Sequence, residues 1–252
     1  MGIEGTSDES LENTELDINE TKLHNSLREK TWDETITKDS WMVFKVMAEF
    51  VDGYEKMAKI GPCVSIFGSA RLKPESKYYQ MAVEIAEKIT KIGFGVITGG
   101  GPGIMEAANR GAKDVDGNSV GCNIVLPHEQ MHNPYMDKFV NIEYFFVRKE
   151  LLRKYSFAFV IMPGGFGTLD EFFETLTLIQ TKKISQFPIV IMGMDYHKNI
   201  KEHVDMMIEA KTISPEDQDL LLFTDDITEA AMHILKYADS NKIIKLKEPK
   251  PN

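Results

Sequence analysis

The stretch FAFVIMPGGFGTLDEFFETL, residues 157–176, gives the clearest indication of the fold class of this 252-residue chain. Its first part, Phe157–Met162, is apolar throughout, as is typical of a strand buried on both faces of a sheet. Three glycines, a threonine and two acids follow within Pro163–Glu171, and Phe172–Leu176 then has the composition of a helix. A buried strand that passes through a glycine turn directly into a helix is typical of α/β proteins with a parallel sheet.

The same alternation of strand and helix continues on both sides of this stretch. Strand-like runs are predicted at Cys63–Phe67, Phe94–Thr98, Ser119–Leu126, Phe139–Phe145, Phe157–Met162, Pro188–Met192 and Leu221–Phe223. Helical patterns are predicted between most of them, at Lys77–Ile92, Ile104–Lys113, Arg148–Tyr155, Thr168–Lys182, Asn199–Glu209 and Thr228–Tyr237. We therefore predict an α/β fold with a parallel sheet and helices on both faces. Ligands of such sheets bind beyond the carboxyl ends of the strands.

The chain before this alternating region has a different composition. Residues 1–22 are acidic and lack aromatic side chains, which predicts a disordered tail. Residues 23–60 are predicted to be an N-terminal helical segment, in which Ser40–Ile60 carries apolar side chains at helical spacing. That apolar face is expected to pack on the main domain or on a partner chain. The main domain is predicted over residues 61–240, followed by a C-terminal tail at 241–252.

Charge and composition limit the classes of function. The net charge of −10 argues against nucleic-acid binding, because proteins that bind nucleic acids usually carry a basic surface. No apolar run approaches the ~20 residues that a membrane span requires, and the N-terminus lacks the pattern of a secretory signal peptide. We therefore expect a cytoplasmic protein with no membrane partner. Cys63 and Cys122 lie in strand-like runs, where buried free thiols are expected rather than a disulfide.

Glycine-rich turns follow three of the predicted strands. They are FGSAR at 67–71, GGGPGIME at 99–106 and PGGFGTLDE at 163–171. The second and third align without a gap, which suggests two equivalent cradles for an anion. Glycine lets the backbone approach a ligand closely, and the start of the following helix offers unpaired N–H groups and a positive dipole end. Both features suit a phosphate group.

The third turn also fits a purely structural role. Thr168 and Glu171 have the T-x-x-E spacing of a capping box, in which the glutamate would only cap the start of its helix. Two matching turns in one sheet favour a ligand over this alternative. The glycines do not have the spacing G-x-G-x-x-G, which disfavours a dinucleotide site.

Charged side chains beside these turns are candidates for catalysis. Glu171 lies just after the third turn, where its carboxylate could activate water or stabilise a cationic sugar. Asp170 and Glu174 are its neighbours, and Glu174 lies on the same side of the helix at i+3. Arg148 shares a helical face with two leucines and should point inward, either as a ligand for a phosphate or base or as half of a structural ion pair. Lys149 lies on a more polar face.

The stretch HEQMH, residues 128–132, has the spacing of a zinc-protease motif. That motif requires a helix, but Pro127 and Pro134 bracket the stretch and no third ligand is obvious. We expect instead that Leu126–Tyr135 is a loop over the site. The polar side chains expected to contact a ligand from this loop are those of Glu129, Gln130 and Asn133.

Together, these motifs resemble the "lonely guy" family of cytokinin-activating phosphoribohydrolases. The third turn matches the family signature P-G-G-x-G-T-x-x-E. The second turn, the FGSAR turn, Arg148-Lys149 and the Leu126-Pro127 loop are also similar. The resemblance covers about residues 60–238. Sequences of this kind are often labelled lysine decarboxylases, but no lysine here has the context of a pyridoxal-phosphate site.

The resemblance implies a Rossmann-like fold that assembles as a homo-oligomer, either a dimer or, as in longer members, a hexamer. It implies hydrolysis of the N-glycosidic bond of nucleoside 5′-monophosphates to free base and ribose 5-phosphate. AMP and N6-modified cytokinin ribotides are the candidate substrates, and we expect no metal and no cofactor. Two alternatives are a regulatory module that binds nucleotides without turnover and a nucleosidase that accepts both purine and pyrimidine monophosphates.

The resemblance also assigns roles to individual residues. Glu171 and Arg148 match the catalytic positions. The residues that match or flank the nucleotide-binding loop are Gly68, Ser69, Gly100, Gly101, Gly103, Met105, Gly164, Gly165, Gly167 and Thr168. Further contacts are predicted from Glu129, Lys149 and Glu174.

Overall fold

The structure is a computed structural model of the chain, and it describes residues 32–126 and 132–240. The predictions for the two tails and for Glu129 and Gln130 lie outside these ranges. The chain divides into two compact units, Met1–Met47 and Ala48–Asn252. The sheet and all the site residues described below belong to the second unit.

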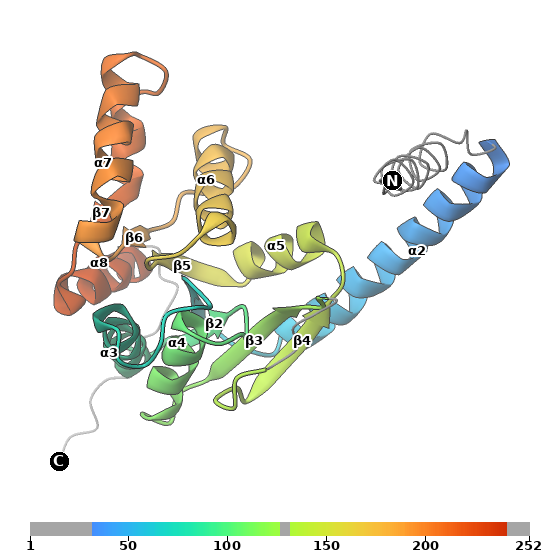
Figure 1. The fold of residues 1–252 in the computed structure, drawn as a ribbon, viewed down its shortest axis with the longest axis horizontal. Helices are drawn as coiled ribbons and strands as arrows, with labels where there is room; N and C mark the ends of the chain where they lie inside the picture. Colours follow the sequence, from blue (N-terminus) through green and yellow to red (C-terminus); the bar gives the residue numbers. More distant parts are fainter. Residues whose placement is uncertain (1–31, 127–131, 241–252) are drawn as a thin grey trace, which may run out of the picture. The chain divides into compact units, whose positions relative to one another are not determined.

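A seven-stranded, all-parallel sheet forms the centre of the second unit, which confirms the predicted α/β class. The strands are β1 (Cys63–Phe67), β2 (Gly95–Thr98), β3 (Ser119–Ile124), β4 (Lys138–Ile142), β5 (Ser156–Ile161), β6 (Ile189–Ile191) and β7 (Leu221–Phe223). The helices are α3 (Lys77–Lys91), α4 (Ile104–Lys113), α5 (Phe145–Lys154), α6 (Phe166–Gln180), α7 (Met194–Glu209) and α8 (Ile227–Ser240), with a 3₁₀ helix at Pro215–Leu220. Helices α3, α4 and α8 cover one face of the sheet, and α5, α6 and α7 lie on the other (Figure 1).

The strand order β4-β3-β2-β1-β5-β6-β7 places β1 directly beside β5, although the two strands are far apart in the sequence. The chain builds β2 to β4 outward from β1, then returns to the opposite side of β1 with β5. Ser65 is in register with Phe159, and Phe67 with Ile161. In open parallel sheets a crevice forms where the winding direction reverses, beyond the carboxyl ends of the two strands. The ends of β1 and β5 therefore mark the expected ligand site.

The two faces of the sheet bury different side chains because residues alternate along each strand. On one face, Val64 and Val160 join a core of apolar residues from α3, α4 and α8. On the other, Phe67 and Phe159 pack edge to face with ring centroids 4.8 Å apart. β1 is buried throughout and β5 is buried from Ala158 onward, which explains why both sequences are mostly apolar without alternation.

Helix α2 (Trp32–Met57) begins eight residues before the predicted Ser40 and crosses the boundary between the two units. Its end belongs to the second unit, where Met57 is buried and a Cβ on Gly53 would lie 2.6 Å from Cδ1 of Leu151. The part in the first unit has exposed apolar side chains, with Trp41 at 66%. The predicted packing of this helix on the main domain is thus found near the C-terminal end of α2. Within the described residues, no helix is long and apolar enough to span a membrane.

Candidate active site

A pocket of about 690 Å³ lies beyond the carboxyl ends of β1 and β5. All three glycine turns contribute to its wall, together with side chains from α5, α6 and α7. The polar and charged side chains that line it are Ser69, Arg71, Tyr78, Arg148, Thr168, Glu171 and Tyr196. The apolar lining includes Met105, Ile124, Leu126, Phe145 and Phe166. The topology of the sheet thus gathers segments that are far apart in sequence at the expected crevice.

The third turn leads into α6, which begins at Phe166 with Gly165 as its N-cap. The amides of Thr168 and Leu169 both donate to the Gly165 carbonyl at 3.1 Å. Thr168 is therefore already inside the helix, and Glu171 lies almost one turn further along. A capping box needs its threonine at the N-cap, so this structural explanation of Glu171 is excluded.

The backbone amides of Gly164, Gly165, Phe166 and Gly167 have no hydrogen-bond acceptor among the described residues. The first amides of any helix lack an intrahelical acceptor, and the helix dipole adds positive potential at the same place. All four residues line the pocket. The third turn therefore offers an anion site of the kind that holds phosphate at the start of a helix.

Gly165 and Gly167 have open space where a Cβ would stand, and neither has a positive φ. The fold does not require glycine at either position. By contrast, a Cβ on Gly164 would collide with the side chain of Thr168. Both glycines line the pocket, where the absence of side chains would let a ligand approach the backbone closely.

We expect Gly167→Ala to separate ligand binding from stability. Alanine in the first turn of α6 should leave the free energy of unfolding unchanged or raise it by ~0.5–1 kcal/mol, because glycine is a poor helix former. The added methyl group should weaken nucleotide binding by roughly tenfold, since one lost hydrogen bond to a charged group is worth about that much. Urea unfolding and calorimetric titration with a nucleoside 5′-monophosphate would test both parts. Unchanged affinity would contradict a phosphate at this turn.

The second turn plays a different part from the third. Gly103 has a φ of 69° and a Cβ there would collide with the carbonyl oxygen of Ser69. The Ile104 amide donates to that same carbonyl at 2.9 Å, so the second turn packs tightly against the first. Only Gly99 and Met105 of the second turn line the pocket, and Gly100 and Gly101 do not. The two turns expected to be equivalent cradles are therefore not equivalent.

Asn133 connects the loop before β4 to the second turn. Its amide donates to the Gly100 carbonyl at 3.0 Å, and its side chain donates to the Gly101 carbonyl at 3.1 Å and to Oδ1 of Asn109 at 2.9 Å. Asn109 in turn bonds Thr98, Ser119 and the Val120 carbonyl. Asn133, predicted as a ligand contact, is thus buried beneath the turn and supports its conformation.

Arg148 lies in the first turn of α5, because that helix begins at Phe145 rather than at the predicted Arg148. Its Nε donates to the Cys122 carbonyl on β3 at 2.8 Å. A Cβ on Gly99 would collide with its Nη2, so the guanidinium passes directly over the second turn. The arginine is therefore held at the pocket wall by its Nε, which leaves the N–H groups of its two other nitrogens available for a ligand.

Glu171 is the buried acid of the pocket, with 6% of its surface exposed. Burial raises the pKa of its carboxyl from 4.5 to about 7. The positive charges of Arg148 and Lys149 lower this pKa and partly offset burial, whereas Glu174 and Asp170 raise it. A carboxyl with a pKa near neutrality can exchange protons with a substrate or with water at physiological pH.

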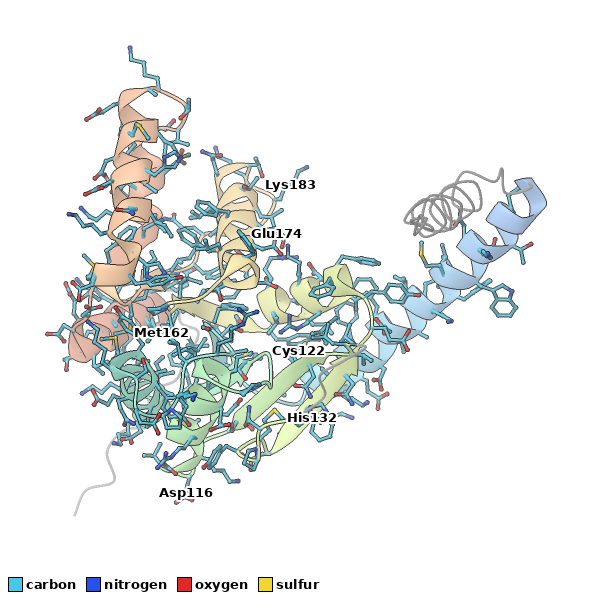
Figure 2. The ribbon with its side chains drawn as sticks, viewed as in Figure 1. Asp116, Cys122, His132, Met162, Glu174 and Lys183 are labelled. Carbon is cyan, nitrogen blue, oxygen red and sulfur yellow. The ribbon has the colours of Figure 1, made fainter. Side chains whose placement is uncertain are left out.

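Lys149 forms ion pairs beside the pocket rather than in its wall. Its Nζ lies 3.0 Å from Asp170 and 2.9 Å from Glu174. Glu174 lies on the side of α6 that faces α5 (Figure 2). Neither Lys149 nor Glu174 lines the pocket, although both were predicted as further contacts. The positive charge of Lys149 lowers the pKa of Glu171, and the negative charge of Glu174 raises this pKa.

Five aromatic residues line the pocket, and none was predicted as a site residue. Phe67 and Phe166 lie within the predicted glycine turns, whereas Tyr78, Phe145 and Tyr196 come from outside them. Tyr196 lies near the start of α7, which begins at Met194 rather than at the predicted Asn199. Its hydroxyl donates to the Gly164 carbonyl at 2.7 Å. The sequence indicates Tyr196 only by its position shortly after β6, because the turn after β6 also lies at the carboxyl edge of the sheet.

The zinc-protease spacing does not produce a cluster of ligands in the part of the chain that is described. No group of three or more His, Cys, Asp or Glu side chains there could hold a metal ion. His132, the described histidine of that motif, is hydrogen-bonded to Asn123 at 2.7 Å and stacks on Phe139. Cys63 and Cys122 are buried free thiols, as predicted. Burial raises the pKa of each to about 12, which keeps them protonated.

Curated relatives include plant enzymes named cytokinin riboside 5′-monophosphate phosphoribohydrolase. LOG3 of Arabidopsis thaliana is 23% identical over 190 residues, which is 73% of this chain and 86% of that protein. LOG4 of the same plant is 24% identical over 196 residues, 75% of this chain and 89% of that protein. An uncharacterized protein of Archaeoglobus fulgidus is 27% identical over 150 residues, 58% of this chain and 95% of that protein.

Among solved structures, the molybdenum cofactor carrier protein of Chlamydomonas reinhardtii has a similar fold. It superposes with a TM-score of 0.54 at 19% identity, and the match covers 71% of this chain and 99% of the carrier. At this identity the similarity shows a shared fold. The model of the family described as "Possible lysine decarboxylase" matches residues 105–234, just over half of the chain. The protein is therefore a member of this family, the lysine decarboxylase-like or LOG family, and a distant homologue of the cytokinin riboside 5′-monophosphate phosphoribohydrolases.

Proposed function

We propose that the protein hydrolyses the N-glycosidic bond of nucleoside 5′-monophosphates, releasing the free base and ribose 5-phosphate. The observation that carries this proposal is the position of Glu171. A buried carboxyl with a pKa of about 7 shares one pocket with four backbone amides that suit a phosphate. Binding a nucleotide would not need this acid, and burying it costs stability. Cleavage of a glycosidic bond does need a carboxylate close to the sugar.

The phosphate would bind the amides of Gly164–Gly167 at the positive end of α6, with the hydroxyl of Thr168 as a further donor. The ribose would then lie against Glu171, which follows the phosphate turn by one helical step. As the bond from C1′ to the base nitrogen breaks, its electrons leave with the base and positive charge develops on the sugar. Water then adds to C1′ and loses a proton, and the base nitrogen gains a proton, so that the products are ribose 5-phosphate and the neutral base. The carboxylate of Glu171 would stabilise the charge on the sugar or take the proton from that water.

Arg148 would act on the other side of the nucleotide. Its anchor on the Cys122 carbonyl fixes the direction of the guanidinium, so that the remaining N–H groups can orient the nucleotide or hold the leaving base. The apolar lining from Met105, Ile124 and Leu126 suits the flat face of a base. AMP and N6-modified adenine ribotides are our candidate substrates, in agreement with the names of the plant relatives.

The name of the family suggests a different reaction, the decarboxylation of lysine. Pyridoxal-phosphate enzymes hold their cofactor through a lysine Schiff base. Among the described residues that line the pocket there is no lysine, and Lys149 is engaged by two carboxylates outside it. The pocket therefore favours glycosidic hydrolysis over decarboxylation.

The test is release of free base from a panel of nucleoside 5′-monophosphates that includes AMP, N6-isopentenyl-AMP and the pyrimidine monophosphates. We expect base and ribose 5-phosphate in equal amounts from the preferred substrates, measured by chromatography. Similar rates with purine and pyrimidine monophosphates would indicate the broader nucleosidase. Tight binding without release of base from any of them would overturn hydrolysis and indicate a regulatory nucleotide-binding module.

A further inference from the structure

We propose that Tyr196 is a positioning residue for the phosphate site, acting through the peptide bond between Gly164 and Gly165. This proposal rests on the proposed function and specifies which side chain prepares the phosphate turn. Tyr196 comes from α7, 32 positions after Gly164, and its hydroxyl donates to the Gly164 carbonyl at 2.7 Å. Both residues line the pocket.

Three successive carbonyls of the phosphate turn are held by donors. The Pro163 carbonyl accepts from the Ser69 amide at 2.9 Å. The Gly164 carbonyl accepts from the Tyr196 hydroxyl, and the Gly165 carbonyl accepts from the amides of Thr168 and Leu169. Of these donors, only the Tyr196 hydroxyl is a side-chain group.

The direction of each carbonyl sets the direction of the next amide. A trans peptide is planar, and its C=O and N–H groups point in opposite directions. Holding the carbonyls of residues 163, 164 and 165 therefore directs the amides of residues 164, 165 and 166 to the opposite side. Those amides have no acceptor among the described residues, and the residues that carry them line the pocket. The hydrogen bonds around the turn thus prepare a row of donors before a ligand arrives.

The peptide between Gly164 and Gly165 depends most on such a bond. Glycine takes both positive and negative φ with little steric cost, so a peptide between two glycines can rotate as a unit. The rotated form would point the Gly164 carbonyl into the pocket, where its partial negative charge would repel a phosphate. The Tyr196 hydroxyl removes this alternative by holding the carbonyl away from the ligand.

The ring of Tyr196 has a separate set of contacts. It lies edge to face against Tyr78, with centroids 6.5 Å apart, and against His197 on its own helix at 5.0 Å. Removing only the hydroxyl leaves these ring contacts in place. Tyr196→Phe therefore tests the hydrogen bond to the turn without opening a cavity.

We expect Tyr196→Phe to weaken binding of ribose 5-phosphate and to raise KM for nucleoside 5′-monophosphates, each by about three- to tenfold. The kcat should change less than twofold, because the positions of Glu171 and Arg148 do not depend on this bond. The rate of base release from the parent nucleoside, which carries no phosphate, should be the same in Tyr196→Phe and in the wild type. Calorimetric titration with ribose 5-phosphate and steady-state kinetics on AMP and adenosine would measure these quantities.

Tyr155→Phe is the matched control, because the Tyr155 hydroxyl also donates to a backbone carbonyl, that of Tyr54 at 3.3 Å, but Tyr155 does not line the pocket. It should bind ribose 5-phosphate as the wild type does. Wild-type affinity in Tyr196→Phe would overturn the proposal, and so would an equal loss on AMP and adenosine, which would indicate a general structural role. If the wild type itself neither binds ribose 5-phosphate nor cleaves any nucleotide, the proposed function fails instead.

Discussion

Glu171→Gln should reduce base release from nucleoside 5′-monophosphates by about 10²–10⁴-fold, the usual contribution of a general acid or base. Glutamine has nearly the same shape as glutamate but can neither carry the negative charge nor accept the proton from water. Nucleotide binding should persist, because the amides at the start of α6 are unchanged. Single-turnover release of base, together with the Kd for AMP, would separate the two effects. Full hydrolysis by this variant would show the mechanism to be wrong.

The same substitution should make the folded protein more stable at pH 8. The native pKa of Glu171 is raised from 4.5 to about 7, so its favourable contribution to stability is complete below about pH 4.5 and is lost as pH rises to about 7. Above that range the native state carries a buried carboxylate at a cost of about 3 kcal/mol, since one pKa unit corresponds to 1.36 kcal/mol. Glutamine is neutral at every pH and should recover ~1–3 kcal/mol of this.

Urea unfolding at pH 8 and at pH 5 would measure that gain, which should shrink at the lower pH because wild-type Glu171 is then mostly protonated in the folded protein. Glu202→Gln is a suitable control, since Glu202 is an exposed acid on α7 whose side chain is 62% accessible. It should alter neither stability nor activity. Reduced stability of Glu171→Gln at pH 8 would mean that the carboxylate is favourably bound rather than strained by burial.

Arg148→Ala should both slow the reaction and change its pH dependence. In the wild type, kcat/KM should rise with pH and level off above about pH 7, as Glu171 loses its proton. The guanidinium of Arg148 lowers the pKa of Glu171, so its removal should move this rise to higher pH. The lost contacts to the nucleotide should reduce kcat/KM by roughly 10²-fold even on the plateau. The measurement is a profile of kcat/KM from pH 5 to pH 9.

Arg148→Lys keeps the positive charge but cannot reproduce the planar fork that bonds the Cys122 carbonyl. Its pH profile should remain close to that of the wild type while its plateau falls. Arg153→Ala controls for the helix, because Arg153 also lies on α5 but pairs with Glu150 outside the pocket. If kcat/KM of Arg148→Ala rises at the same pH as that of the wild type, Glu171 is not the group whose titration controls the rate.

Much of the fold is predictable because burial on both faces leaves a continuous apolar run in each strand. The bounds of β1 and β7 agree with the prediction, and α4 was predicted at Ile104–Lys113 as observed. The start of α5 was placed too late because Phe145 and Phe146 extend the apolar pattern of β4, although both are exposed in the first turn of a helix. Short-range pattern cannot distinguish an exposed aromatic at a helix start from the last residue of a strand.

The site was predicted as far as local spacing allows. The third turn, Glu171 and Arg148 were all expected at the carboxyl edge of the sheet, and the structure brings them into one pocket. The hydrogen bond from Arg148 to Cys122 was not predictable, because its acceptor is a backbone carbonyl, which every type of residue has. Asn133 and Tyr196 were missed as supports for the turns, since both bonds join segments about thirty residues apart. Topology, rather than composition, decides which of those segments meet.

The pairing of β1 with β5 also determines when the pocket can form during folding. Ser65 and Ser156 meet across these strands at 2.6 Å although 91 positions separate them. Closing so long a loop is entropically costly, and contacts of this range form slowly compared with local helices. The pocket has walls from both sides of this pairing, so neither half of the sheet can present it alone. Nucleotide binding should therefore appear only when the central strands have joined, and a bound nucleotide should hold the two halves of the sheet together against unfolding.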